Sequence, residues 1–216
     1  MIHEILVRFA HVAGFIRSQC MPSRKWIIAL KALVAFNLAT SATCFANEDD
    51  FFGSVGAYSG IYSMTSQVEL PDFTDSFIAA ATGSVTLWKP ETLPISFEAE
   101  GMVGFRFGQE TNAEIGISPL VVRWEYFPWN EHLYTNFRIG VAGLSYLAQE
   151  SDLENTGLGA SQLQYFEFLE LTFARPEDKS LELFLRHHHR CTFYETMDDK
   201  HSNGSDYLTI GIRKRF

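Results

Sequence analysis

The sequence predicts an all-β fold, an eight-stranded antiparallel transmembrane β-barrel over residues 47–216. Two observations lead to this fold class. Apolar and polar side chains alternate with a period of two in eight successive segments, as in strands with one face in lipid and the other in a polar interior. Most of these segments are also too long for a soluble sandwich, whose strands run to about 5–6 residues. The eight segments are 53–66, 75–88, 94–107, 113–127, 133–148, 162–175, 180–193 and 205–216.

Residues 1–46 are predicted to be an N-terminal extension and a signal peptide. Basic Arg24 and Lys25 precede an apolar stretch, and a small-x-small pattern ends at Ala46, as in a secretory signal. Translation could start at Met1 or Met21. The whole chain has 17 basic and 26 acidic residues, and residues 1–46 hold five of the basic and one of the acidic ones, which leaves a net charge of −13. Such a charge argues against nucleic acid as a partner.

The polar faces of the predicted strands carry charges of both signs. In residues 94–107, for example, mainly apolar odd positions alternate with polar even positions. A soluble sandwich also alternates, but paired charges in a narrow lumen are typical of small membrane barrels. The charged residues predicted to face the lumen are Glu98, Glu100, Arg106, Arg123, Glu125, Arg138, Glu182 and Arg186.

Two of the segments depart from strict alternation. In residues 113–127, Pro119 separates two apolar series that differ in phase, and a proline inside a paired strand predicts a β-bulge. In residues 162–175, Glu167 disturbs the pattern, and nothing in the sequence explains it.

The connections predict which ends of the strands meet. The short turns 89–93, 128–132 and 176–179 fall after the second, fourth and sixth strands, at the end where both termini of the barrel must lie. We expect this end to be periplasmic. The aromatic residues near these turns predict a girdle at the membrane interface, and a terminal aromatic on an amphipathic last strand resembles the assembly signal of outer-membrane barrels. The predicted girdle consists of Trp88, Tyr126, Phe127, Trp129, Tyr134 and Phe173.

Residues 180–193 combine a strand pattern with three histidines and a cysteine. Leu181, Leu183 and Leu185 share one face, so His189 and Cys191 continue that lipid-facing side. His188 points the other way, toward the lumen. On the next strand, Asp206 precedes Leu208 and Ile210 on the outward face. A thiol, an imidazole and a carboxylate are the nucleophile, base and orienting acid of acyl transfer. The sequence therefore predicts a catalytic group of His189, Cys191 and Asp206.

Metal binding is the main alternative for the histidines. His187 and His189 have a suitable i, i+2 spacing, but no third protein ligand is evident from the sequence. We therefore predict no metal and no cofactor. The loop sequence His201-Ser202-Asn203 also resembles part of a catalytic motif, but adjacent strand residues point to opposite faces.

These residues resemble the lipid A 3-O-deacylases of the outer membrane, a family related to the acyloxyacyl hydrolases. Members of that family are eight-stranded barrels with a His-x-Ser-Asn motif on the penultimate strand and an acidic residue about a dozen positions later. His189-Arg190-Cys191-Thr192 occupies that motif here, and Asp206 follows it. The proline-containing segment 116–127 and the last strand are similar as well.

The sequence departs from this motif at the nucleophile. Cys191 stands where the family has serine, Thr192 replaces the asparagine, and Asp206 must serve for a glutamate. A thiol attacks esters well once a base has taken its proton, so a Cys-His-Asp site is chemically feasible.

The favoured hypothesis is an outer-membrane esterase that removes a hydroxyacyl chain from lipid A in lipopolysaccharide. The first alternative is a non-catalytic barrel of structural or adhesive type, because the substituted motif is also what a barrel that has lost activity would show. The second is a narrow pore, which eight strands disfavour because their side chains fill the interior.

Overall fold

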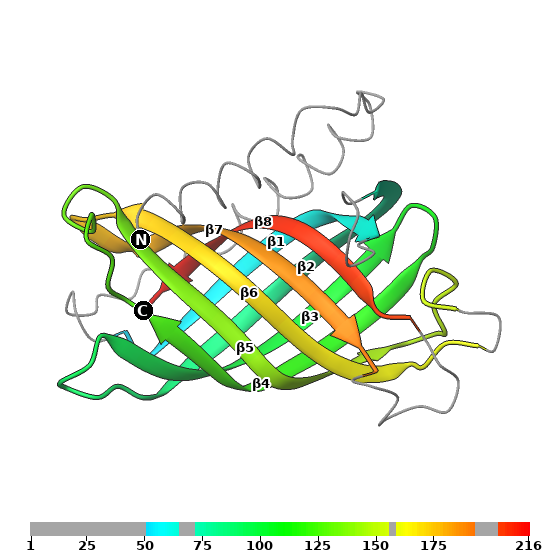
Figure 1. Ribbon diagram of the computed structural model, residues 1–216, viewed down its shortest axis with the longest axis horizontal. Helices are drawn as coiled ribbons and strands as arrows, with labels where there is room; N and C mark the ends of the chain where they lie inside the picture. The colour runs from blue at the N-terminus through cyan, green and yellow to red at the C-terminus, as the bar shows by residue number, and fades with distance from the viewer. Residues whose placement is uncertain (1–50, 65–71, 156–158, 193–202) are drawn as a thin grey trace.

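In the computed structural model, eight antiparallel strands form one closed barrel (Figure 1). The structure describes residues 51–64, 72–155, 159–192 and 203–216, so the predicted signal peptide lies outside the described residues. The prediction of eight strands is confirmed, and their bounds agree with the expected ones to within three residues. The strands are β1 (Gly53–Met64), β2 (Asp72–Trp88), β3 (Ile95–Phe107), β4 (Asn112–Trp124), β5 (Tyr134–Leu147), β6 (Leu163–Arg175), β7 (Asp178–Cys191) and β8 (Ser205–Arg215).

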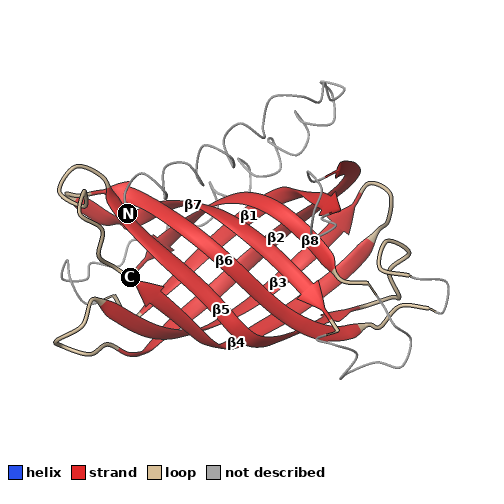
Figure 2. Ribbon diagram, in the orientation of Figure 1, coloured by secondary structure: helices blue, strands red, loops and turns tan. Residues whose placement is uncertain are grey.

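Each strand pairs with its neighbours in sequence, and β1 pairs with β8 to close the sheet. Within the described part of the chain, all regular structure is strand (Figure 2). No helix there is long and apolar enough to cross a membrane. A closed sheet has no unpaired edge, and this is why a strand protein can be stable in lipid.

The outer wall is apolar and the interior is charged, the reverse of a soluble barrel. Val103, Phe105, Ile115, Leu183 and Leu185 are among the large apolar side chains exposed on the outer wall. The interior contains arginines and glutamates that are almost completely buried. An exposed apolar wall of this extent is suited to lipid, so the chain is a transmembrane barrel of the outer-membrane type.

Ion pairs hold the centre of the barrel together. Arg138 contacts Glu98 at 2.7 Å, Glu100 at 2.8 Å and Glu170 at 3.0 Å. Arg186 contacts Glu100 and Glu170 at 2.7 and 2.6 Å. The predicted inward orientation is confirmed for all eight charged residues, although Glu125 sits at the mouth of the barrel and is partly exposed. Breaking one buried pair leaves a charge without compensation, so the network acts as a unit.

The loop between β5 and β6 closes the mouth of the barrel at the end away from Glu125. Glu154 from this loop is fully buried, and its Oε1 accepts hydrogen bonds from Arg106 Nη1 at 2.9 Å and Ser205 Oγ at 2.7 Å. Its backbone oxygen accepts a hydrogen bond from the Asn203 amide. Side chains therefore occupy the interior from the centre to this mouth, which supports the expectation that the barrel is not a pore.

The bulge predicted at Pro119 is confirmed. The β3–β4 register shifts opposite Pro119, where Glu100 pairs with Ser118 but Glu98 pairs with Val121. A second irregularity lies beside it on β5, where Ala142 has φ 55° and the β5–β6 register shifts. The sequence prediction missed this one. Because β4 and β5 are irregular at the same level, the register between them is unchanged across the irregularity, with Ile117 opposite Leu144 and Leu120 opposite Val141.

One residue of the predicted aromatic girdle is placed wrongly. Trp88, Tyr126 and Trp129 are exposed at the short turns as expected, but Tyr134 is buried. Tyr134 opens β5 on the same side as Arg138, so strand alternation turns its ring into the mouth. There the Lys179 ammonium lies 5.4 Å from the ring centre. Proximity to a turn therefore did not predict the orientation of this residue.

Candidate functional site

Three neighbouring strands place polar side chains at one level of the outer wall. Glu167 on β6 lies opposite His189 on β7, and His189 lies opposite Asp206 on β8. All three side chains are partly exposed. Strand alternation directs them outward, and the register of the pairs brings them side by side. The wall therefore presents an acid, an imidazole and an acid in one row.

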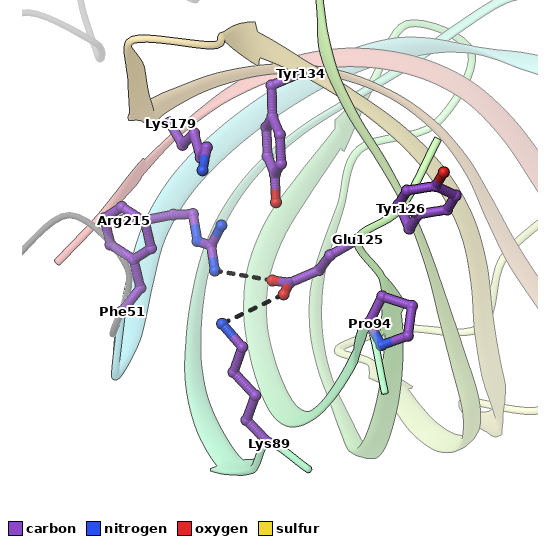
Figure 3. Close-up of a pocket in the computed structure, with 8 residues that line it drawn as sticks. All are labelled: Phe51, Lys89, Pro94, Glu125, Tyr126, Tyr134, Lys179 and Arg215. Carbon is purple, nitrogen blue, oxygen red and sulfur yellow. Dashed lines mark hydrogen bonds and ion pairs between the residues drawn. The ribbon is translucent and has the colours of Figure 1, made fainter. Parts of the chain in front are cut away.

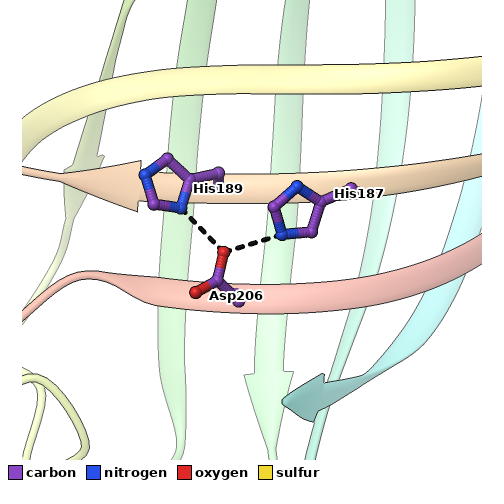
Figure 4. A group of neighbouring side chains, drawn as sticks. All are labelled: His187, His189 and Asp206. Carbon is purple, nitrogen blue, oxygen red and sulfur yellow. Dashed lines mark hydrogen bonds and ion pairs between the residues drawn. The ribbon is translucent and has the colours of Figure 1, made fainter. Parts of the chain in front are cut away.

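Asp206 connects the two outward-facing histidines of β7. Its Oδ1 accepts a hydrogen bond from His189 Nδ1 at 2.7 Å and another from His187 Nε2 at 2.7 Å (Figure 4). The two imidazole planes are inclined by 25°, with ring centres 5.8 Å apart. One carboxylate oxygen can accept two hydrogen bonds, so Asp206 orients both rings at once.

The orientation of His189 leaves its other nitrogen available as a base. When Nδ1 donates to a carboxylate, the second ring nitrogen can accept a proton, as in acyl-transfer triads. Cys191 follows two residues later on the same face of β7 and is partly exposed. The structure thus places all three residues of the predicted catalytic group on the outer face of β7 and β8, and a hydrogen bond joins two of them, His189 and Asp206. Thr192, by contrast, is buried and does not share their face.

The row lies where the outer wall changes from apolar to polar. One step toward the middle of the barrel, His187 is flanked by Leu169 and Leu208, both exposed. The next outward residue of β7 is Leu185, also exposed. Three adjacent strands change character at the same level, as expected at the edge of the hydrocarbon layer. A lipid whose acyl esters lie at that edge would reach the row without leaving the membrane.

The middle histidine of the run belongs to the interior. His188 Nδ1 shares a hydrogen bond with the Tyr58 hydroxyl at 2.9 Å, and its Nε2 contacts Glu114 Oε1 at 3.1 Å. His188 is fully buried. Strand alternation predicted this inward orientation, and the structure confirms it. His188 is therefore part of the polar core and not of the outer row.

Two features of the row were not found from the sequence. The expectation that His187 and His189 lack a third protein ligand is wrong, because Asp206 lies within reach of both. Glu167, which had no explanation, stands directly opposite His189. Alternation along β6 is enough to show that Glu167 faces outward, but the β6–β7 register that aligns it with His189 cannot be read from the sequence.

A hollow of about 240 Å³ lies in the mouth of the barrel at the short turns, at the end away from the outer row (Figure 3). Its central contacts are ion pairs: Glu125 accepts Lys89 Nζ at 3.4 Å and Arg215 Nη2 at 3.4 Å. It is lined by Phe51, Lys89, Pro94, Glu125, Tyr126, Tyr134, Lys179 and Arg215. Glu125 thus ties together two of the three cations in this lining, whereas the outer row combines an imidazole, a thiol and carboxylates, so the outer row is the stronger candidate site.

Comparison with known proteins supports the fold. No protein-family model matches the chain, and no curated protein matches it in sequence. Among solved structures, the outer membrane enzyme PagL is similar with a TM-score of 0.55 and 12% sequence identity, over 76% of this chain and 99% of that one. At this identity the likeness describes the fold alone.

Two further solved structures are similar over a comparable length. Neisserial surface protein A has a TM-score of 0.42 and 10% identity, over 76% of this chain and 97% of that one. The Yersinia pestis outer membrane protein Ail has a TM-score of 0.34 and 12% identity, over 77% of this chain and 100% of that one. The site itself is therefore interpreted from its own geometry.

Proposed function

We propose that this protein is an esterase of the bacterial outer membrane that removes a hydroxyacyl chain from lipid A. The observation that carries the proposal is the 2.7 Å hydrogen bond from His189 Nδ1 to Asp206, with Cys191 beside His189 on the lipid-facing wall. An oriented imidazole next to a thiol is the arrangement that nucleophilic acyl transfer requires.

The membrane supplies the substrate in this proposal. The row lies at the end of the barrel that carries the longer connections, opposite the short turns and residue 216 (Figure 1). In barrels of the outer-membrane type, short turns face the periplasm and longer loops face outward. Lipid A occupies the outer leaflet, where its acyl esters meet the wall near the apolar boundary. A site on the outer wall is suited to such a lipid.

The proposed reaction has two stages. First, His189 takes the proton of the Cys191 thiol while the sulfur attacks the ester carbonyl carbon. The tetrahedral intermediate then collapses, the C–O bond to the sugar breaks, and the imidazolium protonates the departing 3-hydroxyl group. In the second stage, His189 activates a water that cleaves the thioester, which releases a free hydroxy fatty acid and restores the thiol. Asp206 orients His189 and stabilises its positive charge in both stages.

The test is mass spectrometry of lipid A from cells with and without the gene. We expect lipid A from wild-type cells to lack the mass of one hydroxyacyl chain that the deletion strain retains. His189→Ala should restore that mass, because the base is lost. His132→Ala is a matched control, since His132 is exposed in the turn before β5, at the other end of the barrel. It should behave like the wild type.

The same experiment separates the esterase from the alternatives. Identical lipid A in all four strains would reject the esterase, provided that the protein is present and folded in the membrane of the three strains that carry the gene. That result would favour a non-catalytic barrel of structural or adhesive type.

A further inference from the structure

We propose that His187, His189 and Asp206 form a binding site for a transition-metal ion of the Zn²⁺ class on the outer wall. The three ligand atoms, one from each side chain, all lie within 4.8 Å of one another. Two imidazole nitrogens and one carboxylate oxygen form a set that suits Zn²⁺, and nitrogen ligands favour it over Mg²⁺ or Ca²⁺. This inference rests on the geometry of the row and does not depend on the proposed esterase.

The backbone holds the three ligands in place. His187 and His189 are two residues apart on one strand, so they project from the same face. Asp206 lies directly across from His189 on the paired strand β8. β7 is paired on both sides at the two histidines, and β8 is paired with β7 at Asp206, so the sheet holds the Cα positions of the three ligands. Such pre-organisation lowers the cost of assembling a metal site.

The side chains can reach an ion by small rotations of their rings. Zn–N and Zn–O bonds of about 2.0–2.2 Å at tetrahedral angles separate neighbouring ligand atoms by about 3.3 Å. The two hydrogen bonds to Asp206 Oδ1 are now 2.7 Å long. To receive an ion, these two contacts lengthen by about half an ångström, and the two imidazole nitrogens, which lie within 4.8 Å of each other, approach to the same spacing of about 3.3 Å. The His187 side chain is 42% exposed and has the room to rotate.

The ion would keep an open coordination position. Three protein ligands leave the fourth position of a tetrahedral ion to water or to an oxygen of a bound lipid. Cys191 does not belong to the group of mutually close ligand atoms, so its sulfur is not a ligand in this arrangement. The metal site and the proposed catalytic group therefore share His189 and Asp206 but differ in His187 and Cys191.

This overlap has a functional consequence. An ion on His189 Nδ1 displaces the hydrogen bond to Asp206, and the two residues that the esterase needs are then occupied. Bound metal would therefore block ester cleavage, and a chelator would restore it.

Zn²⁺ titration of the full-length protein, purified without a histidine tag in detergent micelles, tests the site by isothermal calorimetry. We expect one Zn²⁺ per chain, and at least a tenfold loss of affinity in His187→Ala and in Asp206→Asn. Cys191→Ala should bind like the wild type even though it should lack esterase activity, so failure of one proposal does not imply failure of the other. Folding of each variant is checked by the electrophoretic shift of the unheated barrel.

Three controls make the result specific. Glu167→Gln removes a carboxylate from the same row but outside the group of close ligand atoms, and it should leave Zn²⁺ affinity unchanged. His132→Ala should do the same. His201 lies outside the described residues, so the titration is repeated in a His201→Ala background. The proposal is overturned if the folded wild type binds no Zn²⁺, or if His187→Ala and Asp206→Asn bind it as tightly as the wild type.

Discussion

His189 and Asp206 face each other across the β7–β8 pair, and His189 Nδ1 donates a hydrogen bond of 2.7 Å to Asp206 Oδ1. The side chain of His189 is 30% exposed and that of Asp206 is 16% exposed, so the pair sits on the wall with one side open. An oriented imidazole on a lipid-facing surface is chemically useful only to a ligand that comes from the membrane or its edge.

Asp206→Asn should reduce the rate of hydroxy fatty acid release by about 10²- to 10⁴-fold, because an amide in place of the carboxylate neither fixes the correct tautomer of His189 nor stabilises its charge. The measurement is fatty acid release from lipid A in mixed micelles. Asp178→Asn is the matched control, at the other end of β7. Equal rates for the folded Asp206→Asn variant and the wild type would remove Asp206 from the proposed mechanism.

Cys191→Ala should abolish fatty acid release, whereas Cys191→Ser should retain at least about tenfold more activity than the alanine variant. The serine hydroxyl would occupy the position of the thiol beside His189, which is oriented by Asp206 as before. Both variants are compared in the same micelle assay. If Cys191→Ala is as active as the wild type, the sulfur is not the nucleophile.

Arg138→Met should destabilise the barrel by about 3–5 kcal/mol, because three buried carboxylates lose their shared partner. Arg138 contacts Glu98, Glu100 and Glu170 at 3.0 Å or less. The free energy of unfolding is measured by denaturant titration in lipid vesicles. Arg175→Met is the control, since Arg175 is exposed at the β6–β7 turn. A loss no larger than that of the control would mean that the ion-pair network contributes little to stability.

Gly211→Ala should also destabilise the barrel, by about 1–3 kcal/mol. A methyl group at this inward position of β8 would lie 2.3 Å from the ring of Phe184 on β7 and 2.5 Å from the backbone oxygen of Ala57 on β1. Gly83→Ala is the matched control, because a methyl group there meets open space at 4.0 Å from the nearest atom. Both variants are unfolded under the same conditions as the wild type. Similar stability of the two variants would show that Phe184 can move aside.

Reconstituted protein should carry no steady ionic current across a lipid bilayer. Arg106, Glu154 and Ser205 close the mouth near the functional row, and the charged network fills the centre. Planar-bilayer recording checks this, with a known porin as the positive control. Discrete conductance steps that depend on the protein would support the pore instead.

The sequence by itself determined the strands and the side of the wall on which each residue lies. Alternation is a local property of the backbone, so it was enough to place His189 and Cys191 outward and His188 inward. It also located the bulge at Pro119, because a change of phase is visible within one strand. It failed at Ala142, where no proline or clear change of pattern marks the bulge.

Only the tertiary structure decided which residues are neighbours across strands. Register depends on the hydrogen bonding and stagger of the whole closed sheet, which no single strand encodes. It placed Asp206 against both His187 and His189, although the sequence had predicted no third ligand and no metal there, and it set Glu167 opposite His189. The chemistry of the row could be predicted residue by residue, but its assembly could not, because assembly depends on contacts between distant parts of the chain.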